Sequence, residues 1–199
     1  MPALIVERQL EIVTQQLVRA KISHDIWWLY KGSETRPAII ETLNEFSEFF
    51  RFDEHAHFVS MVIHCAVVWD NVSGTVSQPT VSKQILDPRR FPADQTLTDD
   101  IAGRAKEAGG LVKLRHEAIA HRSVQFDYSA AFRRAGLVPN SVAGMLEAWL
   151  QLINRLRIRK SLSEVIFAEI PLQHLQQLIH SLGGPNLTPE SPLDELFRR

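Results

Sequence analysis

Apolar residues recur every three or four positions along most of the chain, a spacing that places side chains on one face of an α-helix. Within residues 4–21 the repeat consists of Leu10, Val13, Leu17 and Ala20. A second clear repeat follows Ser141, which we expect to cap that helix, and consists of Val142, Met145, Trp149, Leu152 and Leu156. No stretch alternates apolar and polar residues as a half-buried strand does. The pattern therefore predicts an all-α fold, a compact up-down helical bundle.

Glycine and proline divide this pattern into further helices. Gly32-Ser33 separates the first helix from a second that begins near Pro37 and has one apolar face. That face consists of Ile39, Leu43, Phe46 and Phe50. The remaining elements that we expect are short helices over 81–86 and 129–135, a loop over 87–94, and a last helix from Pro171 to Gly183-Gly184. We expect one domain over residues 1–184, followed by a loosely docked tail over 185–199, which contains three prolines.

The segment from Ala56 to Asn71 is apolar almost all round. Its length of about sixteen residues is long for a buried strand and ordinary for a helix. A helix without a polar face is normally enclosed by other elements. We therefore expect this segment to be the central helix of the bundle, opened by Asp53 and Glu54.

The stretch LVKLRHEAIAHRS, residues 111–123, combines core residues with cationic and titratable side chains. Its leucines repeat at helical spacing, and His121 falls next on their stripe, beside a stripe that carries Arg115 and Arg122. Arginine binds phosphate oxygens through planar donors, and histidine titrates near neutral pH. A helix that holds both side-chain types is suited to phosphate chemistry.

Two local features precede this motif helix. Thr98 is a residue type that caps helices, with two aspartates after it, so we expect the motif helix to begin there. Gly109-Gly110 lies inside the helical pattern, where each glycine costs about 1 kcal/mol relative to alanine. Either the helix breaks at these glycines, or they allow another backbone to approach closely.

Composition narrows the classes of function. Lys plus Arg number 22 and Asp plus Glu number 23, which argues against a broad electrostatic nucleic-acid surface and leaves room only for a local one. The single cysteine, Cys65, excludes an intrachain disulfide. No signal-peptide pattern and no apolar run of spanning length is present, so we expect a cytoplasmic protein without a membrane contact.

The chain from Arg115 to His121 resembles the R-x(4–6)-H signature of the HEPN superfamily, named for higher eukaryote and prokaryote nucleotide binding. The surrounding LRHEAIAHRS, preceded by an apolar helix that ends in Asp70, looks like its abortive-infection subgroup. By order of elements the resemblance covers roughly Phe49 to Lys160. It implies a metal-independent endoribonuclease of toxin or phage-defence type, which works as a homodimer, needs no cofactor and is paired with an antitoxin protein.

The same chemistry can be argued from the residues. RNA cleavage without a metal needs a base for the 2′-hydroxyl, an acid for the leaving oxygen and positive charge near the phosphate. His121 is suited to either proton transfer, and Arg115 to the charge. His116 has a supporting position beside the arginine, and Arg122 is either a supporting cation or a solvated charge at a helix end. Cleavage of this kind leaves a 2′,3′-cyclic phosphate.

Helical geometry adds a condition on assembly. Six residues advance about 600°, so Arg115 and His121 lie about 120° apart on an unbroken helix. They can share one phosphate only if the helix loosens near His121 or if a second protomer brings its own pair. A two-fold dimer through the motif helix would also supply two histidines, one for each proton transfer.

Other interpretations remain open at this stage. Arg115 and His121 could form a structural network in a non-catalytic dimeric module that binds a nucleotide or a protein partner. His55, His57 and His64 could form a metal site with Asp53, although no known metal-binding spacing supports one. The basic run over residues 155–160 could follow an RNA backbone or could be a solvated helix end. Some toxins of the superfamily carry a modified tyrosine two positions after the histidine, and Ser123 stands there in this chain.

Overall fold

Helices form all of the regular secondary structure in the part of the chain that the structure describes. The computed structural model describes residues 5–69, 76–85, 95–120 and 127–187. The helices are α1 (Val6–Lys31), α2 (Arg36–Glu45), α3 (Ser47–Trp69), α4 (Gln78–Ile85), α5 (Gln95–Gly103), α6 (Ala105–Ala120), α7 (Tyr128–Ala135), α8 (Val142–Arg159) and α9 (Ile170–Ser181), with a 3₁₀ turn over Pro139–Ser141. The predicted all-α fold is confirmed. Within these residues, no helix has both the length and the apolar composition needed to cross a bilayer.

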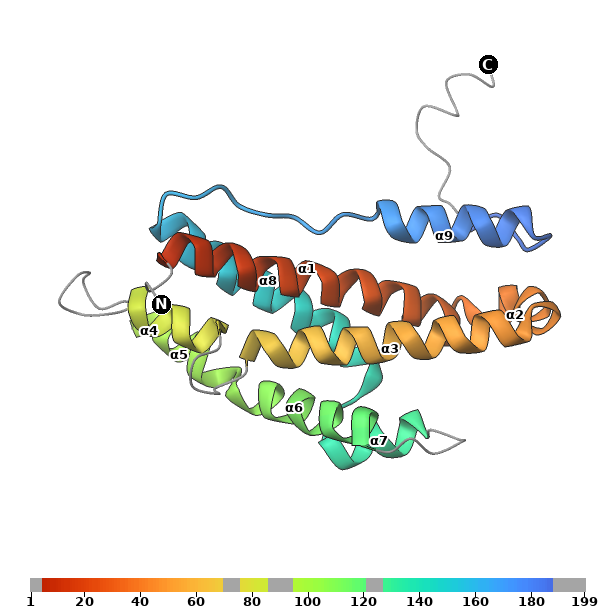
Figure 1. The fold of residues 1–199 in the computed structure, drawn as a ribbon, viewed down its shortest axis with the longest axis horizontal. Coiled ribbons are helices and arrows are strands. Elements are labelled where there is room, and N and C mark those ends of the chain that lie inside the picture. The colour runs from red at the N-terminus through yellow and green to blue at the C-terminus, as the bar shows by residue number, and fades with distance from the viewer. Residues whose placement is uncertain (1–4, 70–75, 86–94, 121–126, 188–199) are drawn as a thin grey trace, which may run out of the picture.

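Helices α1 and α3 lie side by side along the long axis of the molecule (Figure 1). Helix α6 packs on the side of α3 that faces away from α1, and α7 packs on α6. Helices α8 and α9 contact α1. The long helices alternate in direction along the chain, as the colours in Figure 1 show. This is the predicted up-down arrangement, and it puts the motif helix in an outer layer.

Helix α1 extends well past the predicted residue 21 and includes both tryptophans of the Trp27-Trp28 pair. Trp27 is 2% exposed and lies 5.6 Å from Phe58 and 5.8 Å from Phe132, measured between ring centroids. The helix continues because its apolar stripe runs on from Leu10 to Trp27, so each further turn adds core contacts. Helix α1 ends only before Gly32.

The second helix was predicted to run through Phe46 and Phe50, and that prediction is wrong. Helix α2 ends at Glu45 and α3 begins at Ser47, six residues before the predicted start at Asp53. Phe50 still packs beside α2, in a second small core that is completed by Tyr30 of α1 and Ile179 of α9. Breaking the helix at Phe46 lets Phe50 turn into this core. Phe46 itself stays 37% exposed.

The second half of α3 is the predicted central helix. Its fully buried side chains are Phe58, Met61, Val62, Cys65, Ala66 and Val68. This half lies between α1 and α6. Three other apolar residues, Val59, Ile63 and Val67, are half-buried, so the helix is enclosed on most of its sides rather than on all of them. Asp70 and Asn71 lie outside the described residues.

Two predicted helix caps are not found. Thr98 lies inside α5, a separate helix whose Leu97 is fully buried, and the motif helix α6 begins later, at Ala105. Ser141 precedes α8, but its hydroxyl donates to the Val138 carbonyl at 2.7 Å and caps no N–H of α8. Thr98 is thus inside a helix, and the Ser141 hydroxyl is bonded within the turn before α8.

The basic end of α8 is bound to the first helix. Arg157 is 5% exposed, and its guanidinium donates to Glu11 at 2.9 Å and to the Ser163 carbonyl at 2.7 Å. Lys160 pairs with Glu7 at 2.9 Å, and Arg155 pairs with Asp100 of α5. Because these cations have intramolecular partners, they are poorly placed to follow an RNA backbone.

The two glycines of α6 have different surroundings. A Cβ atom at Gly110 would lie 2.9 Å from the Leu137 side chain and 3.0 Å from the Ala135 carbonyl oxygen. A Cβ atom at Gly109 would meet nothing within 4 Å. Helix α6 runs unbroken from Ala105 to Ala120. Of the two expectations for this glycine pair, the close backbone approach is the one observed, and it occurs at Gly110.

These surroundings predict opposite effects of alanine at the two positions. Gly109→Ala should raise the free energy of unfolding by up to about 1 kcal/mol, because it improves helix propensity without a clash. Gly110→Ala should lower it by about 1–3 kcal/mol, because the new methyl group forces α7 away from α6. Urea denaturation of both variants measures the difference. Equal effects in the two variants would contradict the close approach.

A partly buried hydrogen bond joins α1 to α3 near the second core. The Tyr30 hydroxyl, on a side chain that is 1% exposed, donates to the Asp53 carboxylate at 2.7 Å. His57 lies 3.5 Å from the other oxygen of that carboxylate. The contacts with His57 and Tyr30 lower the pKa of Asp53 in spite of its partial burial. Burial and the same carboxylate raise the pKa of Tyr30, so the phenol remains a donor.

This bond predicts a pH-dependent effect of Tyr30→Phe. A carboxylate whose pKa is lowered on folding stabilises the protein above its unfolded pKa, and this contribution is lost as the pH falls through the folded pKa. Tyr30→Phe should therefore cost about 1.5 kcal/mol at pH 7 and clearly less at a pH below the lowered pKa of Asp53, where the carboxyl group is protonated. Urea unfolding of both proteins at the two pH values tests this. A cost that is constant with pH would show that Asp53 is not the acceptor.

Candidate functional site

Helix α6, which carries the motif, presents one apolar and one polar face. Ala108, Leu111 and Leu114 are 6%, 1% and 0% exposed and belong to the main core. The opposite face consists of exposed residues, namely Lys106, Gly109, Lys113 and His116. Helix α6 is thus anchored by its core face while a short basic face remains open to solvent.

The side of α6 next to α7 is fixed by an ion pair. Two guanidinium nitrogens of Arg134 lie 2.9 and 2.6 Å from one carboxylate oxygen of Glu117. Gly110 faces α7 as well, through its contact with Leu137. Residues two apart on a helix are separated by about 200°, so Arg115 lies nearly opposite Glu117, on the flank of α6 away from α7.

Two of the four predicted site residues, Arg115 and His116, lie in the part of the chain that the structure describes. Arg115 is half-buried on that flank, where it has interaction partners, and His116 is exposed at the next position along α6. His121 and Arg122 lie outside the described residues, which end at Ala120 before this segment and resume at Asp127. The described part of the site is therefore a helix flank with a guanidinium and, beside it, a basic face.

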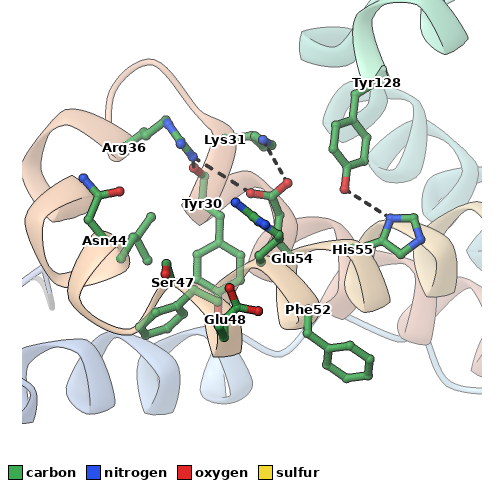
Figure 2. Close-up of a pocket in the computed structure, with 13 residues that line it drawn as sticks. Tyr30, Lys31, Arg36, Asn44, Ser47, Glu48, Phe52, Glu54, His55 and Tyr128 are labelled. Carbon is green, nitrogen blue, oxygen red and sulfur yellow. Dashed lines mark hydrogen bonds and ion pairs between the residues drawn. The ribbon is translucent and has the colours of Figure 1, made fainter. Parts of the chain in front are cut away.

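A groove lies away from the motif, where α1, α2 and α3 meet, close to the start of α7 (Figure 2). It has a volume of about 770 Å³. Leu43, Phe50 and Tyr30 provide apolar walls, and polar side chains from several helices line the rest. The polar lining consists of Lys31, Arg36, Asn44, Ser47, Glu48, Arg51, Glu54 and His55.

Glu54 forms ion pairs with two of the cations that line this groove. Lys31 lies 2.8 Å from its carboxylate and Arg36 lies 3.9 Å from it, as Figure 2 shows. The Lys31 ammonium also lies 5.0 Å from the centre of the Tyr128 ring. Burial and the nearby Glu54 carboxylate raise the pKa of Tyr128, whose hydroxyl lies 3.3 Å from Nδ1 of His55. The charged lining of the groove therefore mixes three cations with two carboxylates, namely Lys31, Arg36, Arg51, Glu48 and Glu54.

The histidines of α3 do not converge. His57 pairs with Asp53, and His55 contacts Tyr128. His64 lies 2.6 Å from the Gln16 side-chain oxygen, and burial with the nearby Arg19 lowers the pKa of His64. Across the ranges that the structure describes, no three His, Cys, Asp or Glu side chains form a group that could hold a metal ion. The metal alternative for these residues has no geometric support there.

The sequence analysis missed most of the groove. Lys31, Arg36 and Tyr128 come from three separate helices, and no spacing in the sequence connects them. Of the groove residues, the sequence analysis named Leu43, Phe50, Glu54 and His55, each for another role. One weak signal was present between Phe46 and His55. This stretch contains more phenylalanines than the apolar face of a single helix can hold, so some of them had to lie elsewhere.

Comparison with models of protein families gives a match to the HEPN domain of the AbiU2 type over residues 4–158. No curated protein and no solved structure matches the chain. The matched region begins before α1 and ends near the C-terminus of α8, so it includes the central helix, the motif helix and the segment with His121. It also extends beyond the predicted start of the resemblance at Phe49. Since the match covers well over half of the chain, this protein belongs to the AbiU2 family of HEPN proteins.

Proposed function

We propose that this protein is a metal-independent endoribonuclease of the toxin or phage-defence type. It acts as a cytoplasmic homodimer, and an antitoxin protein controls it. The observation that carries the proposal is membership of the AbiU2 family of HEPN proteins together with an intact R-x5-H motif, Arg115 to His121, inside the matched region. This family association points to an abortive-infection role.

The position of α6 supports access to RNA and to a second protomer. Helix α6 contacts α3, α5 and α7 and lies in an outer layer of the bundle (Figure 1). Its open face has a small residue, Gly109, flanked by Lys113 and His116. A glycine on an exposed helix face permits close approach of another helix, as a two-fold dimer through α6 requires.

The charge of this face favours an RNA-binding cleft over a dry interface. Within the described part of the chain, the carboxylates of α6 are paired, Glu107 with Arg104 and Glu117 with Arg134. Lys106 and Lys113 make no ion pair with the described residues. A two-fold axis would set these cations opposite their copies, which is unfavourable in a dry interface. Bound phosphate groups would offset the repulsion.

In the mechanism that we propose, His121 of one protomer accepts the proton of the ribose 2′-hydroxyl. The 2′-oxygen attacks phosphorus, and the bond from phosphorus to the 5′-oxygen breaks. The partner's His121 donates a proton to that leaving oxygen, which gives a 2′,3′-cyclic phosphate and a 5′-hydroxyl end. Arg115 stabilises the charge on the phosphate oxygens, with support from His116 and Arg122. No metal-bound water is required.

Single substitutions test the chemistry. His121→Ala and Arg115→Ala should each lower the cleavage rate about 100- to 10,000-fold, because one removes a proton-transfer group and the other removes charge stabilisation. Arg115→Lys should recover only part of the rate, since lysine lacks the planar fork. Cleavage of labelled RNA in EDTA, with analysis of the product ends, measures these effects.

Two matched controls accompany these variants. His174→Ala removes an exposed histidine of α9, and Arg133→Ala removes an exposed arginine of α7; both should leave the rate unchanged. Full activity in His121→Ala would refute the assigned role of the histidine. An intact dimer that cleaves no RNA would favour the alternative, a non-catalytic module that binds a nucleotide or a protein.

A second test addresses assembly through α6. Gly109 and Gly144 are both exposed helix glycines with open space around them. Gly109→Trp should leave the protomer folded, block the approach of a second α6 and give an inactive monomer, whereas Gly144→Trp on α8 should remain an active dimer. Light scattering at micromolar concentration gives the mass of each variant. A dimer that persists in folded Gly109→Trp would place the interface elsewhere.

A further inference from the structure

Three phenylalanines are exposed together at the junction of α2 and α3. Phe46, Phe49 and Phe52 are 37%, 55% and 75% exposed and follow one another at intervals of three residues. Single exposed apolar residues are common, but a contiguous aromatic patch is costly in water and typically marks an interaction surface. Aromatic residues are also the type most enriched in the cores of protein interfaces.

Three carboxylates flank these rings. Glu41, Glu45 and Glu48 are exposed, and none of them makes an ion pair with the described residues. The one exposed cation between residues 41 and 52 is Arg51. We call these six residues, the three phenylalanines and the three glutamates, the acidic aromatic face.

Helix stability does not account for all of these carboxylates. Glu48 lies in the first turn of α3, where a negative charge is favourable. Glu45 is the last residue of α2, at the negative end of the helix, and the last turn contains no basic residue. Carboxylates are unfavourable there. A cationic partner would remove this cost.

The groove of about 770 Å³ adjoins this face. Glu48 and Phe52 line it from the face, and Figure 2 shows both side chains together with Asn44 and Ser47. A side chain that reaches from the face into the groove meets apolar walls at Leu43 and Phe50. The surface therefore combines exposed rings, unpaired negative charge and an adjacent concavity that could take an anchoring side chain.

We propose that the acidic aromatic face docks an amphipathic helix of a protein partner. Apolar side chains of that helix pack on Phe49 and Phe52, and its lysine or arginine side chains lie opposite Glu45 and Glu48. An RNA strand is disfavoured because three carboxylates against one arginine repel phosphate. A second copy of this chain is disfavoured because a two-fold interface would place the acidic face of one protomer against that of the other. This site does not depend on the catalytic proposal for α6.

The test uses the full chain and two synthetic helical peptides of sixteen residues. Both have leucines at intervals of three and four; one has lysines on the flanks of the leucine stripe, and the other has glutamates there. The lysine peptide should bind, more weakly at high salt, and the glutamate peptide should not. The double variant Phe49→Ser with Phe52→Ser should weaken binding on the order of tenfold or more, and Glu45→Gln with Glu48→Gln should weaken it several-fold.

Exposed residues elsewhere provide matched controls. Ile166 is 85% exposed and Glu164 is exposed, so Ile166→Ser and Glu164→Gln change the same properties away from the face and should leave binding unchanged. Fluorescence anisotropy gives the affinities. Three results would overturn the proposal: equal binding of both peptides, binding that survives the phenylalanine double variant, or light scattering that shows self-association lost in that variant. Protection of single-stranded RNA that depends on Phe49 and Phe52 would favour a nucleic-acid surface instead.

Discussion

The packing of α3 against α1 is the contact on which the rest of the described structure depends. Rings and aliphatic side chains of both helices fill the main core, with Leu17 and Trp27 of α1 and Phe58 and Met61 of α3 among the buried residues. Other long helices pack on one of these two: α8 and α9 contact α1, and α6 contacts α3. Helix α6, which carries Arg115, packs on the side of α3 that faces away from α1. The α1–α3 contact therefore determines the position of Arg115. A cavity in the α1–α3 contact would displace the motif helix without touching it.

Much of this fold could be predicted from the sequence, because the spacing of apolar residues within a segment indicates whether that segment is helical. The stripes that contain Leu10, Leu114 and Val142 identified their helices correctly. The helix ends were less predictable. The break at Phe46 and the separation of α5 from α6 depend on Phe50 and Leu97, which turn into cores built from distant segments. The residues next to a helix end do not show which distant segment it will pack against. Thr98 and Ser141 are residue types that favour helix caps, yet neither forms the predicted cap.

The functional residues were likewise predictable only in part. The motif from Arg115 to His121 could be found because its residues are close together in the sequence, and the family match covers it. The groove could not be found, because it joins residues of α1, α2, α3 and α7, whereas the acidic aromatic face lies within residues 41–52. Exposure also has no signature in the sequence. Phe50 and Phe52 look alike there, yet one is 3% exposed and the other 75%.

The close approach at Gly110 has a consequence for the order in which the protein can form during synthesis. Two adjacent glycines make α6 a weak helix by itself, and short helices are only marginally stable in water without tertiary contacts. The residues that press on Gly110 and bind Glu117, namely Ala135, Leu137 and Arg134, all come later in the chain. A nascent chain that has only just left the ribosome through residue 120 lacks these supports. Helix α6 can therefore pack on α3 first, and its contacts with α7 form only after α7 has emerged.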